Sequence, residues 1–181
     1  MKKFEEKTLR TEKIFDGKII SLQVDDVLLP NDQTSQREIV KHSGAVAVIP
    51  MTSDRKIVFV EQYRKPLEKS LVEIPAGKLE QGEKPEVTAV RELEEETGYT
   101  TNNLTFVTSF YTSPGFADEL MYIYLADDLI PLDEPVLGDD DEFVEKVILT
   151  LDEAKQYVTE QRIHDAKTAY ALLYLQLMGL A

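Results

Sequence analysis

The segment that most constrains the fold is PEVTAVRELEEETG, which runs from Pro85 to Gly98. Proline is favoured in the first turn of a helix and glycine just beyond its end, so both boundaries are marked. At about 100° per residue, the small and apolar residues of this segment fall on one broad face. Those residues are Val87, Ala89, Val90, Leu93 and Thr97. The sequence therefore predicts a helix over 85–97 that packs this face against a sheet.

Three runs rich in β-branched residues lie before this helix. They read AVAVIP at 45–50, KIVFVEQY at 56–63 and LVEIP at 71–75, with turn-like polar segments between them. Valine, isoleucine and aromatic residues favour strands, so these runs predict core strands of the main sheet.

Further elements follow the helix. Strands are predicted at 105–111, 120–125 and 144–149. The sequence TLDE at 150–153 fits a capping box that opens one helix, and Asp165 would cap a last helix ending near Gly179. The mixture of elements predicts an α/β or α+β architecture.

Residues 1–42 form a candidate β-rich arm. The run KIISLQVDDVLLP, from residue 18, predicts extended structure, Asn31-Asp32 predicts a turn, and 36–41 predicts a returning strand. So small a set of strands cannot bury both faces alone, which favours docking against another surface. We therefore predict an arm over 1–42 and a main domain over 43–181.

Charge and composition exclude several classes of function. The 181-residue chain has a formal net charge of -14, which opposes non-specific binding to nucleic acid or to an anionic membrane. An anionic substrate must therefore be bound by local arginines or by metal. There are no cysteines, which excludes disulfides, thiolate zinc sites and thiol nucleophiles. No apolar run approaches ~20 residues and the polar start lacks a signal peptide, so cytoplasmic residence is predicted.

Glu92, Glu95 and Glu96 fall within a narrow arc on a second face of the predicted helix. Like charges three or four residues apart cost about a few tenths of a kcal/mol per pair in an isolated helix. The cluster is therefore mildly unfavourable unless a cation binds there. A solvated acidic face is the ordinary interpretation of a bare EEE run. Magnesium is the alternative, because it takes oxygen ligands and combines a few carboxylates with substrate phosphates.

The residues around these glutamates resemble the signature box of Nudix hydrolases, G-x5-E-x7-REU-x-EE-x-G-U, where U is a bulky apolar residue. Every charged and glycine position of the box is matched between Gly77 and Tyr99. Tyr99 departs mildly, since the family more often has an aliphatic residue there. The resemblance implies a Nudix fold, in which a mixed β-sheet is sandwiched between helices, and a pyrophosphohydrolase activity.

The resemblance also implies roles for individual residues. Glu92 and Glu96 would bind the metal, Glu95 would be an auxiliary ligand, and the backbone carbonyl of Ala76 would be another. The implied ion is Mg²⁺, with Mn²⁺ as a possible substitute. The remaining box residues would be structural, namely Gly77, Glu83, Arg91 and Gly98. Arg91 lies one turn before Glu95 and can orient that carboxylate, while Glu83 would anchor its loop or Arg91.

Clustered carboxylates without a thiol, a phosphate-binding loop or a Ser-His-Asp pattern point to attack of water on a diphosphate. In the ADP-ribose group of the family, the general base lies on a loop outside the box. The matching stretch here is GDDDE at 138–142. Glu142 is the first choice as metal ligand or base and Asp140 the second. A solvated acidic turn is the alternative.

The segment TSPGFADE at 112–119 resembles the ADP-ribose subgroup, in which a proline lies about sixteen residues beyond the last glycine of the box. Pro114 holds that position relative to Gly98. A purely structural turn is the alternative, since Ser-Pro-Gly is a good turn sequence. The segments REIVKHSGAVAV, VEQYRKPLE and VEIPAGKLE extend the resemblance over most of the chain. The substrate-binding residues it implies here are Ser113, Pro114, Gly115 and Glu119.

Two arginines outside the box are also implied substrate residues. Arg37 and Arg64 would bind the diphosphate or its attached groups, because a guanidinium can bind such oxygens bidentately. A surface salt bridge is the alternative for each. Family members of this kind are homodimers whose N-terminal arm completes the adenosine site of the partner. Phe15, Ile19 or Phe116 would be candidates for stacking on adenine, with core packing as the ordinary role.

The resemblance therefore implies an ADP-ribose pyrophosphatase that yields AMP and ribose 5-phosphate. One alternative is a pyrophosphohydrolase of another nucleotide sugar, such as GDP-mannose or ADP-glucose. A second alternative is a non-catalytic Nudix-like ligand sensor, against which the intact glutamates argue.

Overall fold

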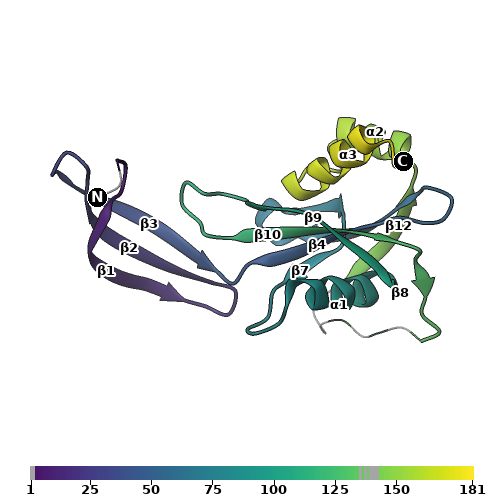
Figure 1. Cartoon of the computed structure of the whole chain (residues 1–181), viewed down its shortest axis with the longest axis horizontal. Coiled ribbons are helices and arrows are strands. Elements are labelled where there is room, and N and C mark those ends of the chain that lie inside the picture. Colours follow the sequence, from purple (N-terminus) through teal and green to yellow (C-terminus); the bar gives the residue numbers. More distant parts are fainter. Residues whose placement is uncertain (1–2, 135, 137, 139–142) are drawn as a thin grey trace. The chain divides into compact units, whose positions relative to one another are not determined.

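The computed structural model describes residues 3–134, 136, 138 and 143–181. The chain divides into two compact units, and Figure 1 shows their helices and strands. The first unit contains 1–44 and 110–121, and the second contains 45–109 and 122–181. The domain boundary expected between 42 and 43 stays a prediction, and the segment 110–121 joins the arm in the first unit.

The first unit is built on a three-stranded antiparallel sheet in the order β1-β2-β3. Its strands are β1 (Lys7–Asp16), β2 (Ile20–Leu28) and β3 (Thr34–His42). The predicted turn after β2 is present, and Asp32 adopts a left-handed φ of 62° there. Every residue of β1 is exposed, so this strand has no buried face. A half-buried strand would show alternating burial along its length.

The second unit contains the remaining elements. One sheet has the order β7-β4-β10-β9 and another has the order β12-β5-β6. Strands β11 and β8 form a third, two-stranded sheet. The bounds are β4 (Ala45–Pro50), β5 (Ile57–Arg64), β6 (Lys69–Glu73), β7 (Ala76–Lys78), β8 (Tyr99–Thr100), β9 (Asn103–Tyr111), β10 (Leu120–Asp127), β11 (Ile130–Pro131) and β12 (Val144–Leu149). The ends of β9 and β10 extend into the first unit.

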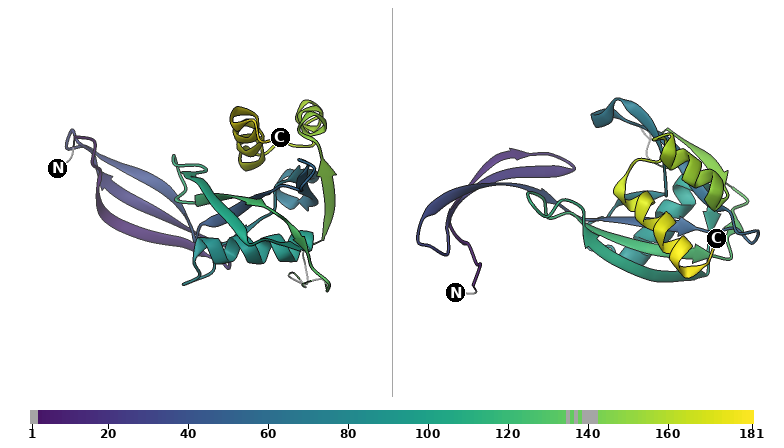
Figure 2. Two further views of the ribbon diagram at one scale, coloured as in Figure 1. Left: turned by 45° about the vertical axis from the view of Figure 1, so that its right-hand side comes forward. Right: turned by 90° about the horizontal axis from the view of Figure 1, so that it is seen from above.

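The helices of the second unit lie on both sides of its sheets. These helices are α1 (Pro85–Thr97), α2 (Leu151–Thr159) and α3 (Ala166–Met178), and a short 3-10 turn, η1, covers Lys65–Leu67. Figures 1 and 2 show α1 on one side and α2 with α3 on the other. No helix in the described ranges is long and apolar enough to span a membrane. Cytoplasmic residence remains a prediction from the sequence.

The helix boundaries follow the predicted caps. Gly98 ends α1 in the left-handed conformation with φ 70°, as glycine allows without a Cβ penalty. Thr150 and Glu153 form the predicted capping box of α2, and the side chain of Asp165 accepts a hydrogen bond from the Thr168 amide at the start of α3. These three cap predictions are confirmed.

The core between α1 and the sheet is small and apolar. Ala89 and Leu93 of α1 pack with Val46 and Val48 of β4, both fully buried. One part of the predicted helix face is wrong, because Val87 is 52% exposed. The buried arc of α1 is centred instead on positions that include two glutamates: Thr88, Ala89, Glu92, Leu93, Glu96 and Thr97. The buried face of α1 therefore includes Glu92 and Glu96 and excludes Val87.

Candidate active site

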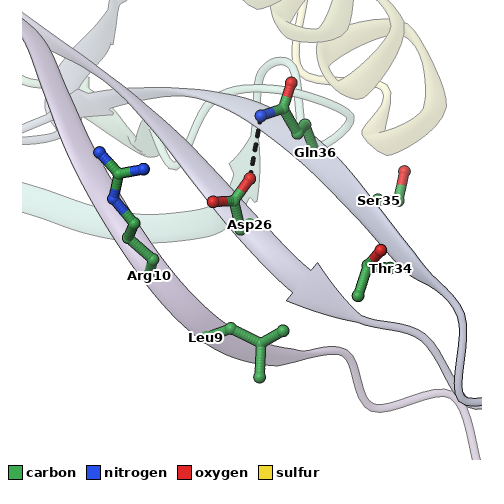
Figure 3. A pocket seen from close by; sticks show the side chains of 6 residues that line it. All are labelled: Leu9, Arg10, Asp26, Thr34, Ser35 and Gln36. Carbon is green, nitrogen blue, oxygen red and sulfur yellow. Dashed lines mark hydrogen bonds between the residues drawn. The ribbon is translucent and has the colours of Figure 1, made fainter.

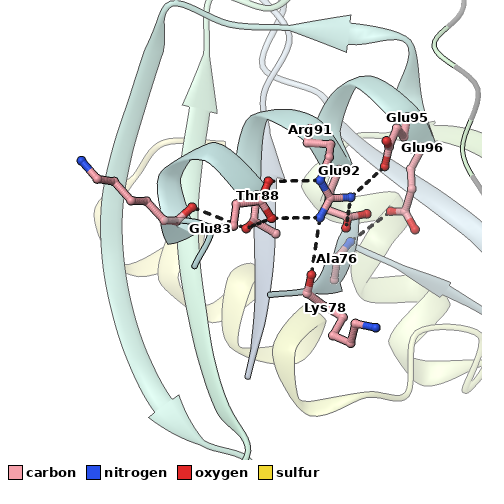
Figure 4. A network of polar contacts seen from close by, with 9 residues as sticks. Ala76, Lys78, Glu83, Thr88, Arg91, Glu92, Glu95 and Glu96 are labelled. Atoms are coloured by element: carbon pink, nitrogen blue, oxygen red, sulfur yellow. Dashed lines mark hydrogen bonds and ion pairs between the residues drawn. The ribbon is translucent and has the colours of Figure 1, made fainter. Parts of the chain in front are cut away.

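Two glutamates of α1 are buried against the sheet side of the helix. Glu92 and Glu96 are each only 6% exposed, and they lie one turn apart. Burying a carboxylate costs free energy unless the group is paired or hydrogen-bonded. The surroundings of both side chains, shown in Figure 4, supply such partners and define the candidate site.

Arg91 is the centre of the polar network. Its Nη1 donates to Glu92 Oε1 at 2.8 Å and to Glu95 Oε2 at 3.0 Å. Its Nε and Nη2 donate to the two oxygens of Glu83, both at 3.3 Å, and Nη2 also lies 3.4 Å from the Lys78 carbonyl oxygen. One guanidinium therefore holds three carboxylates, including the pair with Glu95 that the helical spacing predicted (Figure 4).

The electrostatics of this network favour the charged forms. Burial alone would lower the pKa of Arg91, but the hydrogen bonds to Glu83 and the charges of Glu92 and Glu95 outweigh burial and raise it. The hydrogen bond from Arg91 lowers the pKa of Glu83, and a 2.7 Å hydrogen bond from Thr88 Oγ1 lowers it further. Glu83 thus joins its loop to the helix and to Arg91 as an ionised group.

The turn before the helix is shaped by the same carboxylates. The Ala76 amide donates to Glu96 Oε2 at 3.0 Å. A Cβ on Gly77 would lie 1.8 Å from Glu92 Oε1, a distance that no real side chain tolerates. Glycine at 77 therefore leaves room for the Glu92 carboxylate, which a side chain at this position would displace.

The fit of a metal ion rests on the donor set. Glu92, Glu95, Glu96 and the backbone oxygens near Ala76 are hard oxygen donors of the kind that Mg²⁺ takes. Within the described ranges, no three acidic or histidine side chains come together closely enough to hold one ion. Arg91 donates to Glu92 and Glu95, and the Ala76 amide donates to Glu96. The metal-binding roles of the three glutamates stay predictions.

Arg64, an expected substrate residue, ends strand β5 and is held by a buried acid. Its Nε and Nη2 donate to the two carboxylate oxygens of Glu73 at 2.7 and 2.8 Å. This hydrogen bond is the main cause that raises the pKa of Arg64, and the charges of Glu96 and Asp165 add to it.

Glu73 and Lys167 are residues that the sequence reading missed. Glu73 is 1% exposed, and Lys167 of α3 binds the same carboxylate. Burial would raise the pKa of Glu73, but Arg64 and Lys167 together lower it. The signal that could have found Glu73 is a single charge inside the apolar run LVEIP.

Arg37, the other expected arginine, lies in the first unit. It forms a two-pronged pair with Glu6, with distances of 2.8 Å from Nε and 2.6 Å from Nη2. The hydrogen bond to Glu6 raises the pKa of Arg37. The Arg37 side chain is 40% exposed, and its role in substrate binding stays a prediction.

The expected substrate loop also lies in the first unit. The amides of Phe116 and Ala117 donate to the Ser113 carbonyl at 3.1 and 2.9 Å, so Ser113, Pro114 and Gly115 form a turn. This turn docks on β3 through the Val40 amide, which donates to the Phe116 carbonyl at 2.8 Å.

Glu119 follows this turn. It accepts a short hydrogen bond from Thr112 Oγ1, and its Oε1 lies 3.9 Å from His42 Nδ1. The neighbouring Asp118 pairs with Lys41 and accepts from the His42 amide at 2.9 Å. Burial would raise the pKa of Asp118, but these two contacts lower it.

The two candidate bases, Glu142 and Asp140, lie outside the described residues. Their roles stay predictions. A separate hollow lies on the arm, where Gln36 Nε2 donates to Asp26 Oδ1 at 2.9 Å (Figure 3). No expected site residue lines it; the lining residues are Leu9, Arg10, Asp26, Thr34, Ser35 and Gln36.

Comparison with known families gives two matches along the chain. The family described as "NUDIX domain" matches residues 41–172, and "Nucleoside diphosphate sugar hydrolase N-terminal domain" matches 6–40. Among solved structures, "Crystal structure of ADP compounds hydrolase" superposes with a TM-score of 0.84 at 23% identity, covering 98% of this chain and 97% of that one. This likeness confirms the predicted fold class.

Three curated relatives bear on activity. "Methanol dehydrogenase activator" of Bacillus methanolicus is 62% identical over 97% of this chain and 95% of its own length. "ADP-ribose pyrophosphatase" of Bacillus subtilis is 59% identical, with 98% and 96% covered. "GDP-mannose pyrophosphatase" of Cronobacter sakazakii is 34% identical, with 80% of each covered.

Proposed function

This chain belongs to the Nudix family, and on that premise we propose that it is an ADP-ribose pyrophosphatase that releases AMP and ribose 5-phosphate. The observation that carries the proposal is the 59% identity to an ADP-ribose pyrophosphatase over nearly the whole of both chains. The buried glutamates of α1 supply oxygen ligands for a metal ion, which would in turn bind the diphosphate. Nudix hydrolases generally depend on a divalent metal ion. The finer assignment to magnesium, with manganese as a substitute, is part of this proposal.

Glu92 and Glu96 would hold the ion, with Glu95 beside them. When bound, Mg²⁺ supplies neutralisation of the phosphate oxygens and a lowered pKa for an attacking water. Arg91 orients Glu92 and Glu95 through the hydrogen bonds described above. Arg64 would bind a phosphate oxygen, and Glu142 or Asp140 would accept the proton from water.

The test is a substrate panel measured with Mg²⁺ and again with Mn²⁺. ADP-ribose should give the highest kcat/KM among ADP-ribose, ADP-glucose and GDP-mannose, and EDTA should abolish the activity. A higher kcat/KM for GDP-mannose would contradict the proposed substrate. The variants Glu142→Gln and Asp140→Asn, compared in the same assay, identify the base as the residue whose loss lowers kcat more.

We also propose that the chain works as a homodimer formed through its arm. Support comes from β1, which is exposed along its whole length and carries apolar side chains that are more than half exposed. Those side chains are Leu9, Ile14 and Phe15. Exposed apolar area of this kind is typical of a surface that pairs with another chain. Light scattering should give twice the monomer mass for the wild type and a lower mass for Phe15→Asp; a monomeric wild type would contradict the proposal.

A second candidate function is activation of a methanol dehydrogenase, which the 62% identity to a protein of that name favours. Adding this chain to a methanol dehydrogenase should raise its rate of methanol oxidation. If Glu96→Gln removes the effect, activation depends on the candidate active site. An unchanged rate with the wild type would leave hydrolysis of ADP-ribose as the single proposed function.

A further inference from the structure

A cluster of four buried or half-buried charges lies in the second unit, apart from the Arg91 network. It consists of Arg64, Glu73, Asp165 and Lys167, which we call the Glu73 cluster. Lys167 binds the Glu73 carboxylate and also donates to Asp165 Oδ1 at 3.0 Å. The side chain of Lys167 is only 10% exposed and that of Glu73 only 2%. The cluster therefore contains two cations and two carboxylates, of which Glu73 and Lys167 are the most buried.

Each of the two carboxylates of the cluster needs a compensating positive group. A buried carboxylate needs one cation to compensate it, and Arg64 already binds both oxygens of Glu73. Asp165 is the cap of α3, where its Oδ1 accepts from the Thr168 amide at 3.1 Å. Its other oxygen, Oδ2, is buried without a hydrogen bond to the part of the chain that the structure describes. The amide at the start of α3 does not by itself compensate the charge of Asp165, and Lys167 supplies the cation that does.

The cluster is joined to the candidate active site by the backbone. The Ile74 amide donates to Thr168 Oγ1 at 3.0 Å, which fixes the first turn of α3 to the segment directly after Glu73. That segment continues to Ala76 and Gly77, which contact Glu96 and Glu92. The segment 73–77 therefore places the Glu73 cluster beside the residues that contact Glu92 and Glu96.

Arg64 has one terminal NH₂ group that makes no hydrogen bond to the residues the structure describes. Its hydrogen bonds to the described residues use Nε and Nη2, and none uses Nη1. Its side chain is 37% exposed, so solvent or a ligand can reach it. The guanidinium therefore faces Glu73 with one edge and keeps a terminal NH₂ for an anion.

We propose that Lys167 is a positioning residue for the reaction proposed above. By sharing Glu73 with Arg64 and pairing with Asp165, it keeps the cluster neutral and leaves Arg64 Nη1 to bind a phosphate oxygen of the substrate. Without Lys167, one cation would face two carboxylates, and the net negative charge would repel an anionic substrate. This inference rests on the proposed function. It concerns substrate binding rather than the hydrolytic step, because Lys167 acts on the substrate through Arg64 and the charge of the cluster.

The first test separates KM from kcat with ADP-ribose as substrate. Lys167→Met should raise KM about tenfold with kcat changed by less than about twofold, which is the pattern of lost binding. Lys167→Arg should restore most of the affinity because it keeps the charge. Lys155→Met, on the exposed face of α2, is the matched control and should match the wild type. A lower melting temperature with an unchanged KM would mean a merely structural role and would overturn the proposal.

The second test needs no hydrolysis, so it also works if ADP-ribose is not the substrate. Calorimetry with inorganic pyrophosphate and Mg²⁺ should show about tenfold weaker binding for Lys167→Met and for Arg64→Gln. The double variant should bind no more weakly than Arg64→Gln, because Lys167 acts through Arg64. Fully additive losses, or no measurable binding by the wild type, would overturn the positioning role. A wild type that binds pyrophosphate but does not hydrolyse ADP-ribose would contradict the proposed function alone.

Discussion

The Arg91 network and the Glu73 cluster are two groups of buried charge in the same unit, and they are balanced differently. Arg91 faces three carboxylates, and Glu96 adds a fourth nearby. The Glu73 cluster sets two cations against two carboxylates. Only the first group has a surplus of negative charge.

The difference in net charge indicates what each group is suited to bind. A buried surplus of carboxylates is costly by itself, and a bound cation removes that cost. A neutral cluster has no such need, and it can hold an arginine for an incoming anion without repelling it. Under the proposed function, the Arg91 network would bind the diphosphate through a metal ion, and the Glu73 cluster would bind it through Arg64.

We expect the largest effect from removing one negative charge of the Arg91 network. Glu96→Gln keeps the shape of the side chain and removes one negative charge from the surplus, so kcat/KM for ADP-ribose should fall more than about 100-fold. Glu94→Gln, on the same helix, is the matched control and should retain wild-type kinetics. Equal activity of Glu96→Gln and the wild type would mean that the surplus does not serve catalysis.

A second change tests whether the Glu92 carboxylate must lie over the backbone. Gly77→Ala would place a Cβ 1.8 Å from Glu92 Oε1 and displace that carboxylate. We expect kcat/KM to fall about 10- to 100-fold, as when the support of a metal ligand is disturbed. Gly82→Ala is the control, because its added Cβ meets nothing within 4 Å, although its φ of +83° makes the substitution strained. Gly82→Ala should therefore lose stability and keep activity; the same loss of activity in both variants would point to a general effect of glycine.

The stability that the Glu73 cluster contributes should depend on pH. The pKa of Glu73 is lowered below its ordinary value of 4.5, so the folded state binds its proton less readily than the unfolded state. Its contribution to stability is present above that value and is lost as pH falls through the lower folded pKa. The free energy of unfolding, measured with urea, should therefore decrease from pH 6 to pH 3. Glu73→Gln should flatten this dependence, and an unchanged slope would exclude Glu73 as a cause.

These two groups also mark the limits of what the sequence predicts. The helix 85–97, its glycine cap and the pair of Arg91 with Glu95 follow from local spacing and were predicted. Strands β7, β8 and β11 have only two or three residues, too few to show a period. Lys167 lies 94 residues from Glu73, so only the tertiary fold brings the two charges together.

We expect the smallest effect at Val87, which is exposed although its apolar side chain predicted burial. An apolar count assigned this residue to the packed face of α1, but buried Glu92 and Glu96 take that side and leave Val87 52% exposed. Val87→Ser should therefore change the free energy of unfolding by less than about 0.5 kcal/mol. Leu93→Ala, at a fully buried position of the same helix, should cost about 2–5 kcal/mol. Urea unfolding of both variants measures the contrast. Equal losses of stability in the two variants would mean that Val87 is packed as tightly as Leu93, which would contradict the burial pattern of α1.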